Sequence, residues 1–223
     1  MDPRLRAAVD ASVCWYEELF ALHGVAHRMA DGLWWALAPP PPLHSAAKSV
    51  QPWATSELTL RRVAAYPQCS VADSFGALVL PGFDLLFEAR WLYREPLGKG
   101  PAPLPAGWAP VRTAEELAEW TARHDTTGVL LPGLLSRSSI TVLGLRVDRD
   151  LVAGAVVHAC RGVASLSNVW AAPGHVPDWS ELVRVVHAVR PAMAVVGYER
   201  GENLSRALEA GFADVGPQLV WIR

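Results

Sequence analysis

The chain has 223 residues, of which 51% are apolar and 19% charged, so it can bury a large core and is too apolar to be disordered. Its net charge of −2 is divided evenly, with 9 basic against 10 acidic residues up to position 104 and 11 against 12 after it, which argues against the basic surface of a nucleic-acid-binding protein. No apolar stretch reaches the ~18 residues of a membrane-spanning helix, and the N-terminus lacks the apolar core of a signal peptide, so we expect a cytoplasmic protein without a membrane-spanning segment.

The first half of the chain is predicted to begin with a helix and to continue in short strands. Apolar residues recur at helical spacing from Pro3 to Leu22. Asp31-Gly32 is a favoured turn between the two strands of a hairpin. Ser56 is a candidate N-cap for a helix that runs through Tyr66. Apolar runs around Val79 and from Phe83 to Trp91 are typical of strands.

A segment rich in proline and glycine, Leu97–Pro110, predicts a linker between two regions of regular pattern. After it, Thr113 and Glu116 have the spacing of a capping box, which predicts a helix from Thr113 to His124. Three strands, a helix, a strand, a helix and a last strand are predicted next, at Ile140–Val147, Leu151–Cys160, Val163–Ala171, Asp178–Val189, Ala194–Tyr198, Gly201–Ala210 and Val215–Ile222. This order predicts an α/β (α+β) fold with a mixed sheet flanked by helices, and two domains, 1–104 and 105–223.

The cysteines number only three and are widely spaced, at Cys14, Cys69 and Cys160. An odd, sparse set argues against a disulfide framework and predicts small buried hydrophobic side chains. His158 and Cys160 alternate onto one strand face, but no third and fourth ligand follow at a suitable spacing. We therefore expect no metal site.

The last quarter of the chain carries a family likeness. The segment GYERGENLSRALEAGFADVGPQLVWIR, Gly197 to Arg223, resembles the fifth strand, the following helix, the Gly-Phe after it and the closing strand of GNAT N-acetyltransferases. The segment LSNVWAAP, Leu166 to Pro173, is similar to the fourth strand of that family with its trailing proline. The resemblance covers about 115 residues, from Pro110 to the end. It implies a GNAT-like acyltransferase fold for residues 105–223.

The first half contains an echo of the same segment. Val71–Arg94 resembles Tyr198–Arg223, and Gly82-Phe83 lies 129 residues before Gly211-Phe212. A tryptophan follows each Gly-Phe, after eight residues in the first case and nine in the second. The echo predicts tandem GNAT-like halves, of which the first, 1–104, is degenerate and truncated.

The resemblance also implies an acyl donor, acetyl-CoA or another, and a place for it. The family binds the pyrophosphate of acetyl-CoA at R/Q-x-x-G-x-G/A, on backbone amides at a helix N-terminus. The matching residues here are Val176–Glu181, in which Val176, Trp179 and Glu181 replace the Arg/Gln and the two glycines. This loop is therefore predicted to be degenerate. The remaining candidates for donor binding are Val169, Ala171 and Asn203.

The catalytic positions of the family are also altered. Ser165 and Ser167 stand where many members carry a general-base carboxylate, and Ala207 stands where a tyrosine acid is common. The polar residues left at the predicted cleft are Asn168, Tyr198 and Glu199, at the edge where open α/β sheets bind ligands. Glu199 is the candidate base or a backbone cap, and Asn168 binds a substrate carbonyl or joins two strands. Asp73 and Ser74 occupy the equivalent place in the first half, where a turn is favoured over a second site.

Three functions follow from these observations. The first is a GNAT-type acyltransferase that acts on a small-molecule amine. The second is a non-catalytic GNAT-like binding protein. The third is a transferase that uses aminoacyl-tRNA or a carrier-bound acyl donor, since tandem GNAT-like halves occur in aminoacyl-tRNA-dependent transferases; the neutral charge balance counts against tRNA.

Overall fold

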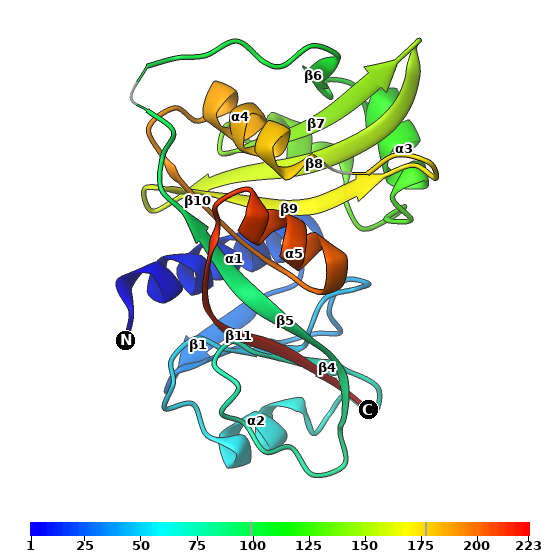
Figure 1. Cartoon of the computed structure of the whole chain (residues 1–223). Coiled ribbons are helices and arrows are strands. Elements are labelled where there is room, and N and C mark those ends of the chain that lie inside the picture. Colours follow the sequence, from blue (N-terminus) through cyan, green and yellow to red (C-terminus); the bar gives the residue numbers. More distant parts are fainter. Residues whose placement is uncertain (99, 177) are drawn as a thin grey trace.

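The computed structural model describes residues 1–98, 100–176 and 178–223, and these form one mixed sheet of eleven strands with helices on both faces (Figure 1). The strand order is β1-β2-β3-β4-β11-β5-β10-β9-β8-β7-β6. The strands are β1 (His27–Ala30), β2 (Leu33–Ala36), β3 (Ala47–Ser49), β4 (Ser70–Asp73), β5 (Asp84–Arg94), β6 (Trp108–Pro110), β7 (Ile140–Val147), β8 (Asp150–Cys160), β9 (Val163–Ala171), β10 (Ala194–Glu199) and β11 (Ala213–Ile222). The helices are α1 (Pro3–Leu22), α2 (Ser56–Val63), α3 (Ala114–Arg123), the 3-10 helix η1 (Pro132–Ser136), α4 (Trp179–Val189) and α5 (Gly201–Glu209).

Local signals in the sequence account for most of these elements. The α3 capping box is confirmed, because Thr113 and Glu116 each bond the other's backbone amide. Asp31 and Gly32 both have positive φ, 52° and 78°, as the predicted hairpin turn requires. The side chain of Asp178 caps α4, and the strands and helices predicted after residue 139 are all confirmed.

The expected strand around Val79 is wrong. Leu78 and Leu80 are buried there while Val79 is 73% exposed, but the segment pairs with no strand of the described chain. The N-cap of α2 is Thr55 rather than Ser56, and α2 ends at Val63. The short strands β3, β4 and β6 escaped prediction because three or four residues are too few to show a period. One of them, β6, lies inside the predicted linker.

The two faces of the sheet carry different helices (Figure 1). Helices α4 and α5 pack on one face, where Trp179, Leu182 and Ala207 meet Val157 of β8. Helices α1 and α3 pack on the other, where Trp120 of α3 belongs to the same apolar cluster as Trp15 and Leu19 of α1. Alternate residues of each central strand are thus buried under helices on opposite sides. Among the described residues, no helix has the length and apolar character needed to cross a membrane.

Strands from both halves of the chain alternate at the centre of the sheet. Strand β5, from the first half, pairs antiparallel with β10 on one side and with β11 on the other. The pairing directions are symmetric about the β11–β5 pair. On each side the next pairing is antiparallel and the one after it is parallel, because β3-α2-β4 and β9-α4-β10 are both parallel crossovers. Two related halves that each place their last strand beside the other would produce this order. The tandem origin and the division at residue 104 stay predictions.

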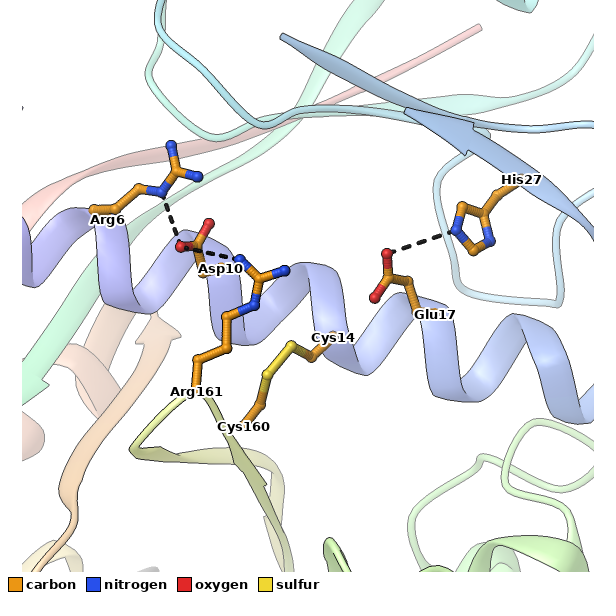
Figure 2. The surroundings of a disulfide bond; sticks show 7 residues. All are labelled: Arg6, Asp10, Cys14, Glu17, His27, Cys160 and Arg161. Carbon is orange, nitrogen blue, oxygen red and sulfur yellow. Dashed lines mark hydrogen bonds and ion pairs between the residues drawn. A yellow bond between two sulfur atoms is a disulfide. The ribbon is translucent and has the colours of Figure 1, made fainter. Parts of the chain in front are cut away.

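Helix α1 lies across the middle of the molecule (Figure 1), and a disulfide attaches it to the sheet (Figure 2). Cys14 of α1 forms a disulfide with Cys160 at the end of β8, so the expectation that these two are unpaired small hydrophobes is wrong. The two cysteines are 146 residues apart in sequence, and the packing of α1 on β8 brings them together. Cysteine spacing in the sequence does not predict this contact. Asp10 pairs with Arg161 beside the bridge. Disulfides are rare in a reducing cytosol, and the cytoplasmic location stays a prediction.

Candidate functional site

Strands β9 and β10 separate after a short parallel pairing. Their register covers only Val163–Ser165 against Ala194–Val196. At Gly197 a Cβ atom would lie 2.7 Å from the carbonyl oxygen of Leu166, so glycine alone fits this close approach. Beyond it, a register shift between β8 and β9 and a positive φ of 51° at Asn168 mark a bulge. The strands therefore open at the ends predicted to form the cleft.

The opening leads into a cavity of about 520 Å³ on the face of the sheet that α1 covers. Its walls come from α1, the loop before β3, β5, the segment after α3, and the ends of β9 and β10. The lining residues that carry polar or aromatic side chains are Ser12, Trp15, Tyr16, His44, Phe87, Trp91, His124, Thr126, Ser165, Ser167, Asn168, Tyr198, Glu199 and Arg200. All three candidate catalytic residues lie among them, although their roles stay predictions.

Glu199 is half-buried at the end of β10, where the chain turns into α5. Burial raises the pKa of its carboxyl to about 7, and hydrogen bonds to the side chain of Asn203 and the backbone of Arg200 oppose that rise only in part. A carboxyl with this pKa exchanges its proton near neutral pH. Such a group can serve as a general base toward a substrate in the cavity.

The other two candidates lie on the two strands that border the opening, Tyr198 next to Glu199 on β10 and Asn168 on β9. Tyr198 is 43% exposed, and its ring meets Trp91 edge-on with 5.4 Å between ring centroids. Asn168 lies on the β9 bulge, and its side-chain amide donates a 3.1 Å hydrogen bond to Oγ of Ser167. The Asn168 carbonyl oxygen and the Tyr198 hydroxyl take part in no hydrogen bond among the described residues. Both are thus available to a ligand.

His44 is a cavity residue that the sequence did not single out. Its Nδ1 lies 2.9 Å from the carbonyl oxygen of Pro42, so Nδ1 carries the proton and Nε2 is an acceptor. Burial lowers the pKa of His44 to about 4, which keeps the ring neutral. The ring packs edge-on against Tyr16 of α1, with 5.3 Å between centroids. A lone histidine beside a proline run carries no local signal of a site, because only the fold brings it to the cavity.

Lys48 lies behind two of the cavity's aromatic residues. It is 1% exposed, and its ammonium nitrogen is 5.0 Å from the ring centroid of Trp91 and 5.4 Å from that of Tyr16. Burial lowers the pKa of Lys48 to about 7, and the nearby Asp73 opposes this. Lys48 is therefore a buried, titratable group at the back of the site.

Asp73 and Ser74 form a closed turn. The Asp73 carboxylate accepts a 2.8 Å bond from the amide of Leu78, a 3.2 Å bond from the amide of Phe75 and a 3.1 Å bond from Oγ of Ser49. Both residues have no exposed surface. The carboxylate's bonding capacity is used within the protein, as the favoured interpretation of a turn implies.

The candidate donor-binding residues lie in three different settings. Val169 lines the cavity, Ala171 is half-buried at the end of β9, and Asn203 of α5 lowers the pKa of Glu199. At the start of α4, the Asp178 carboxylate accepts the amide of Glu181. Trp179 is 4% exposed and packs edge-on against Phe212, 5.6 Å between centroids. Pro177, also part of the predicted degenerate loop, lies outside the described residues.

In the described ranges 1–98, 100–176 and 178–223, no group of three or more His, Cys, Asp or Glu side chains is placed to hold a metal ion.

Comparison with solved structures identifies the class of fold. No model of a known protein family matches the sequence, and no curated protein matches it. A GCN5-related N-acetyltransferase from Kribbella flavida superposes with a TM-score of 0.60 at 17% identity, over 95% of this chain and 94% of that one. A protein assigned to the GNAT acetyltransferases from Novosphingobium aromaticivorans DSM 12444 gives 0.62 at 16% identity, over 96% and 95%. A conserved protein of unknown function from Staphylococcus epidermidis ATCC 12228 gives 0.62 at 12%, over 88% and 92%.

These likenesses extend over nearly the whole chain and not only over its second half. The chain has the GNAT fold, as the resemblance in its last quarter predicted. At identities this low, the likeness concerns the fold and leaves the activity to the site itself.

Proposed function

We propose that the protein is an acyltransferase that acylates a small-molecule amine, with Glu199 as the general base. The observation that carries the proposal is a carboxyl of raised pKa beside an opening between parallel strands, at the wall of a cavity. A GNAT fold supplies the context, since acetyltransferases of this fold are among its structural neighbours.

The chemical steps follow from the charges of the reactants. An aliphatic amine has a pKa near 10 and arrives as an ammonium ion, so it must lose a proton before its nitrogen can attack. The Glu199 carboxylate accepts that proton. The nitrogen then forms a bond to the acyl carbon, and the bond from that carbon to the leaving group breaks. The leaving group takes a proton, for which the Tyr198 phenol is a candidate donor, and the second proton of the acylated nitrogen returns to the Tyr198 phenolate.

The acyl donor is less clearly indicated by the structure than the amine acceptor. A diphosphate binds at a helix N-terminus when free amides and positive dipole face it. At α4 this position presents the Asp178 carboxylate, already bonded to the Glu181 amide, and a tryptophan that is buried in the core. These residues do not fit the diphosphate of coenzyme A. We therefore expect acetyl-CoA to bind with a dissociation constant of ~0.1 mM or poorer, because each lost charge-assisted bond removes about 1.5–3 kcal/mol.

A donor of another kind, carrier-bound or on tRNA, stays an alternative. Loss of the donor site also favours the second candidate function, a non-catalytic protein that binds an amine in the same cavity. A thermal-shift panel with acetyl-CoA, longer acyl-CoAs and free CoA separates these cases, since a ligand of the native state raises the melting temperature by mass action. Low-micromolar acetyl-CoA binding by calorimetry would overturn the assignment of the α4 N-terminus as a lost site.

The base is tested by Glu199→Gln, with Glu202→Gln as the matched control. Glu202 lies three residues away on α5, its side chain is 85% exposed, and its partner among the described residues is Arg206. Glu199→Gln should lower turnover by about 10²–10⁴-fold, whereas Glu202→Gln should keep it. Wild-type turnover should rise with pH to a plateau above an apparent pKa near 7. A Glu199→Gln protein with full activity would remove Glu199 as the base.

Stability distinguishes the base from a structural cap. The native pKa of Glu199 is raised, so the native state binds more protons than the unfolded state between about pH 4.5 and 7, and stability falls as pH rises through that window. Glutamine removes this cost. The variant should therefore melt no lower than the wild type at pH 8, and a lower melting temperature with intact turnover would mark Glu199 as a cap.

A further inference from the structure

We propose that the cavity binds amines that carry one cationic nitrogen and an aromatic or similarly flat apolar group, that is, arylalkylamines. The inference rests on the proposed function, because it names the acceptor class for the same cavity. It is carried by two independent features of the walls, their aromatic side chains and their single carboxylate.

The aromatic side chains that line the cavity come from three elements of the fold. Trp15 and Tyr16 project from α1, Phe87 and Trp91 from β5, and Tyr198 from β10. The edge-on pair of Trp91 and Tyr198 places two of these rings against each other, and Tyr198 directly precedes Glu199 on β10. Aromatic surfaces pack against flat apolar groups and also attract cations through their faces. Lys48 already lies over Tyr16 and Trp91, and Arg200 over Phe87, so the rings supply a flat apolar surface to a ligand and Glu199 supplies the counter-charge for its cation.

The charges in the cavity select a monocation. Glu199 is the only carboxylate among the described residues that line it. Burial lowers the pKa of His44 to about 4 and also lowers the pKa of His124, so neither adds a positive charge at neutral pH. The Arg200 guanidinium lies 4.7 Å from the ring centroid of Phe87 at the edge of the cavity. The Lys48 ammonium stays behind the wall.

One carboxylate can pair with one ammonium group. A polyamine or an aminoglycoside would bring several cations into an aromatic cavity, where the unpaired ones would lose hydration without a counter-ion. An apolar alcohol would leave Glu199 without its partner. The volume of about 520 Å³ is in the range of sites for drug-sized molecules and accommodates an aromatic ring with an aminoethyl arm.

The test is calorimetric binding of phenethylamine and tryptamine to the intact protein at pH 8. Comparison ligands are 2-phenylethanol, which lacks the cation, spermidine, which lacks the ring, and octanoate, which represents an acyl chain. We expect the two arylalkylamines to bind roughly tenfold tighter, or more, than any comparison ligand. Their affinity should fall by about tenfold or more at pH 5.5, where Glu199 is protonated and the amine is still charged.

Two variants assign the contacts. Glu199→Gln should weaken arylalkylamine binding by about tenfold or more, and Glu202→Gln should leave it unchanged. Tyr198→Ala removes a side chain that is 43% exposed, so folding should tolerate it. Arylalkylamine binding should weaken, and binding of the small amine ethylamine should not. Melting temperatures of all variants show that the folded protein is compared.

The outcomes separate this inference from the proposed function. Arylalkylamine binding without turnover by any acyl donor would support the inference and contradict the acyltransferase. Acylation of spermidine in preference to arylalkylamines would overturn the inference and keep the acyltransferase. Equal binding of 2-phenylethanol or octanoate, or no binding of arylalkylamines to the folded protein, would also overturn it.

Discussion

Loss of the Cys14–Cys160 disulfide should destabilise the protein strongly. The bond joins residues 146 positions apart, so it restricts the unfolded chain far more than a short loop would. The chain-entropy relation gives about 5 kcal/mol for a loop of this length at 25 °C. For a chain of this size, about 1 kcal/mol shifts the melting temperature by roughly 2–4 °C, so reduction should lower it by about 10–20 °C.

The assay is guanidinium unfolding, followed by tryptophan fluorescence, of oxidised protein, reduced protein and the Cys14→Ser/Cys160→Ser double variant. Reduced wild type and the double variant should unfold at the same lower denaturant concentration. Cys69→Ala is the control, since Cys69 is a buried free thiol and its loss removes no cross-link. If oxidised and reduced protein unfold at the same denaturant concentration, one explanation is that the loop-entropy reasoning for this bond is refuted. The other is that α1 leaves the sheet before global unfolding, and hydrogen exchange of the α1 amides distinguishes the two.

Three further predictions concern the site and its supports. Because the pKa of Lys48 is lowered, the native state binds fewer protons than the unfolded state between about pH 7 and 10, and stability should rise with pH there. Lys48→Met removes the cost of burying the ammonium group and should stabilise the protein at pH 6 by up to about 5 kcal/mol. A loss of stability at pH 6 would contradict this burial cost. Gly197→Ala should destabilise by about 1–3 kcal/mol, because its Cβ would meet the Leu166 carbonyl; an unchanged denaturation midpoint would show that the strands part freely. Asp73→Ala leaves three donors unpaired, two of them buried, and should cost about 3 kcal/mol or more in urea unfolding. A neutral effect would mean that water replaces the carboxylate.

The sequence by itself determined the elements whose signals are local. The capping box at Thr113, the hairpin turn at Asp31-Gly32 and the cap at Asp178 each involve atoms within three or four residues, so composition and spacing are sufficient to predict them. The GNAT fold was predicted from a resemblance to that family, which is carried by the uninterrupted strand, helix, Gly-Phe and strand after Gly197. Glu199, Asn168 and Tyr198 could be placed at one edge, since the ends of neighbouring parallel strands meet there.

Only the tertiary structure decided which distant segments meet. The insertion of β5 between β10 and β11, the bridge from Cys14 to Cys160 and the arrival of His44 at the cavity all join parts of the chain that no periodicity links. The raised pKa of Glu199 depends on the same contacts, because desolvation is the sum of every neighbour that displaces water. The sequence gives each residue's type, but the packing of helices and strands determines its burial and therefore its pKa. The order of these elements along the chain does not predict their order in space.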